Sequence, residues 1–207
     1  MTAGIDFWFD FSSPYSYIAS GWVDALAARH GRSVRRHAIL LGATFQAAGL
    51  KPPVAFPLKG AYSLHDFARS ARFHGLAYTP PPVFPIPTQN AARVFWWLHD
   101  TPQAHGRYGP QAAAAWAQAG LQGVFTAGLP LHEAAGLHAL ARAQGLDPAE
   151  VDSVAADPHW KARLKQANDE AIAGGVFGAP FFKIDGEPFW GNDRQPQMER
   201  WLDQGPF

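Results

Sequence analysis

Hydrophobic residues near the start of the chain alternate with a period of two. Every second residue from Ile5 to Phe11 is apolar, with Asp6, Trp8 and Asp10 between them. This alternation is typical of a β-strand that runs along the surface of a buried core. The chain is therefore predicted to open with a strand.

The segment after this strand has the pattern of a helix. Apolar residues recur at helical spacing between residues 15 and 26. Ser13 suits the N-cap and Pro14 the first helical position, while Gly31 supplies the stop. A second strand is predicted over residues 34–41. A strand, a helix and a second strand at this spacing predict a right-handed βαβ unit with parallel strands.

The middle of the chain, from about residue 42 to residue 175, has helical segments separated by proline and glycine and no convincing strand. One helix is predicted around residues 64–71, with Ser63 and Asp66 as a capping pair and Gly75 as the stop. The other predicted helices cover residues 89–99, 109–120, 131–144 and 158–173.

Two dipeptides in this part, Asp147-Pro148 and Asp157-Pro158, suit an N-cap followed by the first helical position. The proline-rich stretch 78–87 is predicted to be an extended loop.

The end of the chain returns to the strand pattern. Residues 181–184 and 187–190 flank Asp185-Gly186, a two-residue turn of the type that closes β-hairpins. A last helix is predicted near residues 195–202. The order of elements therefore predicts a sheet-bearing domain that is split by a helical insertion.

Composition narrows the class of protein. Hydrophobic residues make up 47% of the 207 residues, and 8 Trp and 15 Phe favour a large core, a pocket or a subunit contact. Lys+Arg and Asp+Glu both count 17, without a basic run, so nucleic-acid binding is disfavoured. We expect no signal peptide, because the opening residues have no basic region, and no membrane span. A cytoplasmic protein follows from these expectations.

The absence of cysteine limits the chemistry. Disulfides, thiolate metal sites and cysteine nucleophiles are excluded, so any thiol chemistry needs a sulfur from outside the chain. No metal site is predicted, because the histidine pairs 65/74 and 132/138 lack the spacing that brings two imidazoles together on one helix face.

Three short segments could carry chemistry, although each also has an ordinary structural explanation. Residues 12–16 form a tight, hydroxyl-rich junction between strand and helix, where a serine could bind an anion or simply cap the helix. Pro180 precedes an apolar strand, and by itself favours a trans peptide at a strand start. Residues 190–194 form a polar cluster at the last helix. Lys51 and Lys59 could face an anionic ligand or the solvent.

Together these segments resemble a known family. They are DFWFDFSSPYSYIA at residues 6–19, GLKPPV at 49–54 and GGVFGAPFFKIDGEPFWGNDR at 174–194. Ser13-Pro14-Tyr15-Ser16 stands where a disulfide-forming protein of the DsbA kind carries Cys-Pro-x-Cys. With serines in place of both cysteines, the chain is similar to kappa-class glutathione transferases and most similar to the 2-hydroxychromene-2-carboxylate isomerases.

The resemblance implies a thioredoxin-like α/β fold interrupted by a large all-helical insertion. Residues 1–41 and 175–207 would form the thioredoxin-like domain, with residues 158–174 as a bridging helix. Residues 42–157 would form the insertion.

The resemblance also implies a site for reduced glutathione. Ser13 would be the catalytic residue and hold the glutathione sulfur as a thiolate. Ala179, before a cis-Pro180, would pair with the cysteinyl backbone of the tripeptide. The γ-glutamyl end would be bound by a polar cluster made of Asn192, Asp193 and Arg194. The chain departs from the family at Leu50, where the isomerases usually have a glutathione-binding asparagine.

The implied activity is glutathione-dependent cis–trans isomerisation of 2-hydroxychromene-2-carboxylate to trans-hydroxybenzylidenepyruvate, in the degradation of aromatic compounds. The implied partners are a small aromatic carboxylate substrate and a second copy of the chain in a homodimer, with no nucleic acid and no membrane. Two alternatives stay open: a kappa-type glutathione transferase acting on another electrophile, which Leu50 motivates, and a redox-dead thioredoxin-fold binding protein, which the lack of cysteine motivates.

Overall fold

The computed structural model describes residues 4–102 and 107–207. Residues 1–3 of the predicted thioredoxin-like part and residues 103–106 of the predicted insertion lie outside the described residues. The strands are β1 (Ile5–Phe9), β2 (Val34–Ala38), β3 (Phe181–Ile184) and β4 (Glu187–Trp190). The helices are α1 (Pro14–Ser20), α2 (Val23–Arg29), α3 (Leu41–Ala47), α4 (Pro57–Phe73), α5 (Gln89–Asp100), α6 (Pro110–Ala127), α7 (Ala134–Ala143), α8 (Pro148–Ala156), α9 (Pro158–Ala173) and α10 (Gln195–Gln204), with 3₁₀ helices η1 (Pro53–Ala55) and η2 (Asn192–Arg194).

The four strands form one mixed sheet in the order β2-β1-β3-β4. β1 and β2 are parallel, while β3 runs antiparallel to both β1 and β4. The predicted βαβ unit and the predicted hairpin are therefore confirmed, and the hairpin turns at Asp185-Gly186 with both residues at positive φ. The thioredoxin-like fold, with its block of helices between β2 and β3, is confirmed as well.

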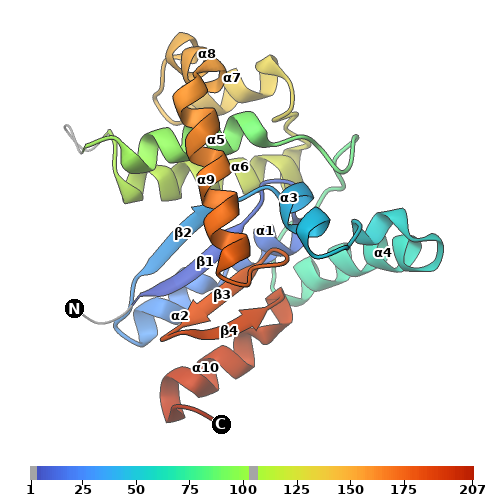
Figure 1. Ribbon diagram of the computed structural model, residues 1–207. Helices are drawn as coiled ribbons and strands as arrows, with labels where there is room; N and C mark the ends of the chain where they lie inside the picture. The colour runs from blue at the N-terminus through green and yellow to red at the C-terminus, as the bar shows by residue number, and fades with distance from the viewer. Residues whose placement is uncertain (1–3, 103–106) are drawn as a thin grey trace.

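The alternation along β1 divides its side chains between the two faces of the sheet. Phe7 and Phe9 belong to the main core, together with Ile18 of α1 and Met198 of α10. Trp8 faces a smaller cluster on the side of α9, which crosses the sheet in Figure 1. Burial of each such phenylalanine stabilises the fold by about 1.5–3 kcal/mol.

The helices between β2 and β3 build the rest of the molecule. Figure 1 shows α5 to α8 gathered beyond one end of the sheet, and α4 projecting from the body on another side. No strand interrupts this block within the described residues, as predicted. The limits of the insertion at residues 42 and 157 stay a prediction. Among residues 4–102 and 107–207, every helix is too short or too polar to cross a bilayer.

The first predicted helix is broken into α1 and α2 at Gly21 and Trp22. A Cβ on Gly21 would lie 2.9 Å from the side chain of Leu76, which follows α4. The glycine therefore lets Leu76 pack closely against the backbone at this point. Glycine also lowers helix propensity by about 1 kcal/mol relative to alanine. The prediction of one continuous helix up to Gly31 was wrong for this reason.

The second strand ends at Ala38, three residues earlier than predicted. The backbone N–H of Leu40 donates to the side chain of Asn168, and that of Leu41 donates to the side chain of Asp10. These amide groups are thereby withdrawn from the sheet, and the chain turns into α3, which the sequence pattern did not predict.

The capping pair proposed at Ser63 and Asp66 was wrong. α4 begins at Pro57, and Ser63 is a buried residue inside the helix. Asp66 instead accepts a hydrogen bond from Tyr15 on α1. The Asp66 carboxylate, which the sequence pattern assigns to a helix cap, therefore takes part in a contact between α1 and α4. The predicted stop at Gly75 is correct, with φ +69° just after the helix.

Most other predicted elements are confirmed. Asp147 and Asp157 each cap a helix, since their side chains accept from the N–H two residues later. α6 continues seven residues beyond its predicted end at Gly120, where a Cβ would meet the ring of Phe11 at 2.7 Å. That glycine permits close packing inside the helix and does not end it.

Candidate active site

A pocket of about 1170 Å³ opens beside the carboxyl end of β1. Its wall is formed by the β1–α1 loop, α3, α4, the segment before β3 and the 3₁₀ helix η2. The predicted site residues that line it are Ser13, Ala179, Pro180, Asn192, Asp193 and Arg194. The fold therefore brings together groups that come from opposite ends of the chain.

Ser13 stands at the start of α1 and lines the pocket. It is the N-cap of that helix, and its Oγ accepts a hydrogen bond from the Ser16 N–H at 3.1 Å. The same hydroxyl donates to the carbonyl oxygen of Ala179 at 3.1 Å. Ser13 is 3% exposed. One side chain thus both caps α1 and lines the pocket.

The peptide between Ala179 and Pro180 is cis. The carbonyl of Pro180 accepts from the N–H of Gly191 at 3.0 Å, which ties this segment to the start of η2. The isolated pattern had favoured a trans proline, so that interpretation was wrong, whereas the cis form implied by the family resemblance is present.

The polar cluster after β4 forms η2. Asn192 is buried, and the guanidinium of Arg194 donates to the Asp193 carboxylate at 2.7 Å. This ion pair is partly exposed, so its direct contribution to stability is small. The pair offers a carboxylate and a cation side by side, which suits the ammonium and carboxylate of an amino-acid group.

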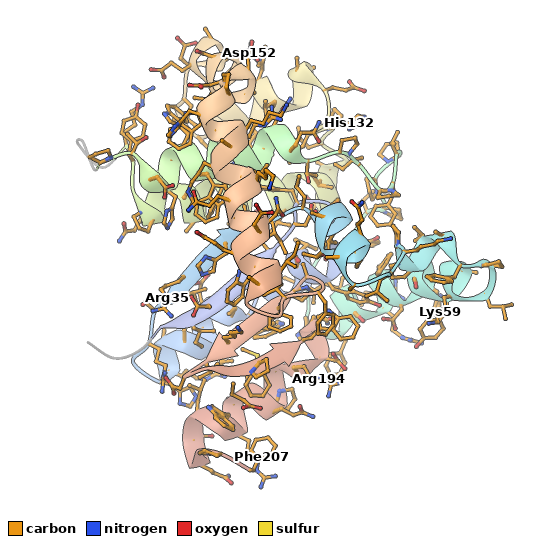
Figure 2. All side chains as sticks on the ribbon, viewed as in Figure 1. Arg35, Lys59, His132, Asp152, Arg194 and Phe207 are labelled. Atoms are coloured by element: carbon orange, nitrogen blue, oxygen red, sulfur yellow. The ribbon has the colours of Figure 1, made fainter. Side chains whose placement is uncertain are left out.

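The other side of the pocket carries Leu50, Lys51 and Lys59. Lys59 lies at the projecting end of α4, as Figure 2 shows, with its Nζ 5.4 Å from the centre of the Phe56 ring. Leu50 is 45% exposed, and an apolar side chain occupies this part of the wall. Both lysines line the pocket, so a ligand bound there could meet their charges.

Sequence reasoning missed the contact between Tyr15 and Asp66. The Tyr15 hydroxyl donates to Asp66 Oδ2 at 2.6 Å, and both residues line the pocket. Burial and then the neighbouring carboxylate raise the pKa of Tyr15 above its ordinary value, because both disfavour the ionised phenolate. The bond holds α4 against α1. No local pattern could have found it, because the partners are 51 residues apart.

Asp10 was also missed as a site residue. It is almost completely buried at the carboxyl end of β1, and it lines the same pocket. Burial opposes ionisation and outweighs the hydrogen bonds that its carboxylate accepts from Ser12, Leu41 and Thr88, so its pKa is raised. A polar residue at the end of an alternating strand, just before the Ser13 loop, was the available signal.

No group of three or more acidic or histidine side chains able to hold a metal ion occurs within the described parts of the chain. The arrangement instead combines the Ser13 hydroxyl, the backbone of the cis-proline segment and the ion pair of Asp193 and Arg194. The pocket volume exceeds the roughly 300–1,000 Å³ that holds one drug-sized ligand. A tripeptide thiol and a second small molecule therefore fit these residues in size and chemistry.

Comparison with known proteins agrees with this fold. The family model described as DSBA-like thioredoxin domain matches residues 4–203. A 2-hydroxychromene-2-carboxylate isomerase of Sphingobium xenophagum is 29% identical over 98% of this chain and 99% of its own length. Another from Pseudomonas sp. (strain C18) is 30% identical over 98% of this chain and 91% of its own length.

Glutathione S-transferase kappa 1 of Caenorhabditis elegans is 38% identical over 39% of this chain and 36% of its own length. Among solved structures, a 2-hydroxychromene-2-carboxylate isomerase has a TM-score of 0.85 at 24% identity, covering 98% of this chain and 95% of that one. The cytosolic disulfide reductase DsbM from Pseudomonas aeruginosa with GSH has a TM-score of 0.59 at 19% identity, covering 98% and 94%. These two structures are similar in fold.

Proposed function

The chain belongs to the DsbA-like thioredoxin family and, within it, to the 2-hydroxychromene-2-carboxylate isomerases, and from this membership we propose that it is a glutathione-dependent cis–trans isomerase. The proposed substrate is 2-hydroxychromene-2-carboxylate and the proposed product trans-hydroxybenzylidenepyruvate. The observation that carries the proposal is Ser13, a buried serine at a helix N-terminus that lines the pocket of a chain without cysteine.

When bound, glutathione would supply a thiolate that adds reversibly to the conjugated double bond of the substrate and so permits rotation about it. The task of the protein is to keep this sulfur ionised at neutral pH. A free thiol has a pKa near 8.5, and each unit by which the protein lowers it takes about 1.4 kcal/mol of preferential thiolate stabilisation.

Ser13 is suited to this task. Its hydroxyl hydrogen is directed at the Ala179 carbonyl, and rotation about the Cβ–Oγ bond would direct it at a sulfur in the pocket instead. The oxygen keeps the hydrogen bond from Ser16 N–H in either orientation, so the hydroxyl group stays in place. The N-terminus of α1 adds fractional positive charge at the same point.

The remaining predicted residues would hold the tripeptide. The backbone of Ala179 before Pro180 would pair with the cysteinyl unit as an added strand does. Asp193 would bind the γ-glutamyl ammonium, and Arg194 with Asn192 its carboxylate. The names of the kappa transferase and of the glutathione-containing DsbM structure support a glutathione site in this fold.

The substrate would occupy the part of the pocket that α3 and α4 enclose. Phe45, Phe67 and Phe84 supply an apolar wall there for an aromatic ring. Lys51 and Lys59 at the rim would attract its carboxylate. We also propose a cytoplasmic location, which cell fractionation would check, a homodimeric assembly, and no binding to nucleic acid or membrane.

The test is an ultraviolet titration with reduced glutathione at pH 7 that follows thiolate absorbance. The wild-type protein should give a thiolate signal, and Ser13→Ala should lose it and lower kcat by about 10²–10³, the usual effect of removing one donor to a developing anion. Ser20→Ala is the matched control, because this hydroxyl is buried in the same helix but bonds to the Tyr17 carbonyl away from the pocket. A Ser13→Ala protein of full activity contradicts the proposal.

A kappa-type glutathione transferase is the second candidate. Leu50 favours it, since an apolar side chain lines the pocket where the isomerases usually have asparagine. The two functions differ in the fate of glutathione: a transferase consumes one molecule per turnover, and an isomerase leaves the total unchanged. Measuring free thiol during turnover separates them. Membership of an enzyme family argues against the third interpretation, a non-catalytic binding protein.

A further inference from the structure

Asp10 is a buried carboxylate on which three parts of the pocket converge. Its Oδ1 accepts from the Ser12 N–H at 2.8 Å, the Ser12 hydroxyl at 3.0 Å and the Thr88 hydroxyl at 2.8 Å. Its Oδ2 accepts from the Leu41 N–H at 2.7 Å. All four of these donors are neutral, so the carboxylate holds them through hydrogen bonds and not through an ion pair.

Two of these bonds fix the starts of the helices that face the pocket. Thr88 is the N-cap of α5, yet its side chain makes no capping bond and donates to Asp10 instead. The N-cap of α3 is Leu40, whose side chain cannot cap, and the free N–H of Leu41 at the first helical position is satisfied by Asp10. Asp10 therefore takes the place of a local cap at the start of α3, and it anchors the N-cap residue of α5 through that residue's side chain.

The other bonds fix the loop that carries Ser13. Both donor groups of Ser12 bind the Asp10 side chain, and the N–H of Ser13 donates to the Asp10 backbone carbonyl at 2.9 Å. The position of the Ser13 hydroxyl relative to Ala179 thus depends on Asp10 through two consecutive residues.

We propose that Asp10 is a positioning residue, which locks the Ser13 loop to the starts of α3 and α5 and thereby aims the Ser13 hydroxyl at the thiol of bound glutathione. The inference rests on the proposed function and deepens it. It assigns to Asp10 no contact with the reacting atoms.

Positioning and simple charge effects predict opposite results when Asp10 is replaced by asparagine. A carboxylate near a thiolate disfavours it, so a charge effect alone would make the bound thiol more acidic in Asp10→Asn. Loss of positioning makes it less acidic. Asparagine cannot restore the site, since its NH₂ group must face either the Ser12 or the Leu41 N–H, and two donors cannot pair.

The experiment measures the pKa of the bound glutathione thiol from thiolate absorbance as a function of pH. We expect Asp10→Asn to raise it by about one unit, a tenfold smaller ratio of thiolate to thiol. Binding of glutathione at pH 5, where the thiol is protonated, should stay within about threefold of wild type, because the tripeptide contacts lie on Ala179 and η2. An unchanged or lowered thiol pKa overturns the proposal.

Asp6→Asn is the matched control. Asp6 is a hydrogen-bonded carboxylate on the same strand, but it binds Arg35 and His37 and does not line the pocket. It should leave the thiol pKa unchanged. If the wild-type protein gives no thiolate signal, the proposed function itself is refuted. If wild type and Asp10→Asn give equal thiol pKa values, only the role of Asp10 is refuted.

Thr88→Val provides a milder variant in case Asp10→Asn does not fold. It removes one donor to the carboxylate and frees the start of α5. The thiol pKa should rise by less than in Asp10→Asn but in the same direction. If Thr88→Val folds and its thiol pKa equals that of wild type, the positioning role is refuted.

Discussion

At the scale of single residues, the molecule depends on groups that serve two purposes. Ser13 caps α1 and also presents its hydroxyl to the pocket, so an ordinary capping serine and a candidate catalytic serine are the same side chain. Asp10 directly follows β1, and its side chain holds the loop before α1. Several glycines are also required by the packing, because a neighbouring atom leaves no room for a methyl group at their positions.

Gly136→Ala should lower the free energy of unfolding by about 1–3 kcal/mol, the usual cost of overpacking. A Cβ at this position in α7 would lie 2.2 Å from the backbone oxygen of Pro130, which cannot move away as a flexible side chain could. Urea denaturation checks the change. Gly42→Ala in α3 is the control, since nothing lies within 4 Å of its Cβ position, and it should be neutral or stabilising. Equal stability of both variants would contradict this account.

At the scale of elements, the pairing of β1 with β2 combines hydrogen bonds with charge. Asp6 and Arg35 are register partners, and Arg35 donates Nε and Nη2 to the two carboxylate oxygens at 2.8 and 2.6 Å. His37 Nε2 lies 2.8 Å from Asp6 Oδ1. Burial disfavours the ionised carboxylate, but the bonds from His37 and Arg35 outweigh it and lower the pKa of Asp6 to about 2.

Asp6→Asn should therefore lower the free energy of unfolding at pH 7 by about 1 kcal/mol, after allowance for solvent screening around the exposed Arg35. The pKa of Asp6 is lower in the folded than in the unfolded protein, so its contribution is present above the ordinary value of 3.8. It is lost as the pH falls toward about 2. Urea denaturation of both proteins across this range checks the expectation. A difference in stability that stays constant down to pH 2 would contradict it.

At the scale of the whole molecule, α4 extends from the body (Figure 1). Several apolar side chains of this helix are exposed. Leu58 is 90% exposed and Phe73 is 85% exposed. Exposed apolar groups of this kind are typical of protein contacts. Because α4 also lines the pocket, an assembly through this helix would join the subunit contact to the substrate wall.

Sedimentation equilibrium should give twice the monomer mass at micromolar concentration. Leu58→Asp should shift the protein toward the monomer, because it introduces a charge among apolar groups that a partner would cover. Phe207→Asp is the control, a change of an exposed apolar residue beyond α10, which Figure 2 shows apart from α4. A protein that sediments as a monomer before any substitution contradicts the expected homodimer.

Elements with local signals can be predicted from the sequence alone. The hairpin at residues 181–190 follows from alternation and an Asp-Gly turn, and α9 follows from an aspartate cap, a proline and helical spacing. The lack of cysteine and the order of the Ser13, Pro180 and 192–194 segments pointed to the family and to the candidate site. These features depend on neighbours within a few residues or on residue type alone, so one sequence suffices to find them.

Contacts between groups that are distant in the sequence depend on the folded arrangement of the chain. Ser13 and Ala179 are 166 residues apart, and their contact exists because β3 inserts beside β1 in the sheet. Asp66 was assigned to a helix cap because local bonding is what a pattern can predict, whereas Tyr15 supplied a better partner. Asp10 draws amide and hydroxyl groups from three segments for the same reason: a buried carboxylate must find donors wherever the fold brings them.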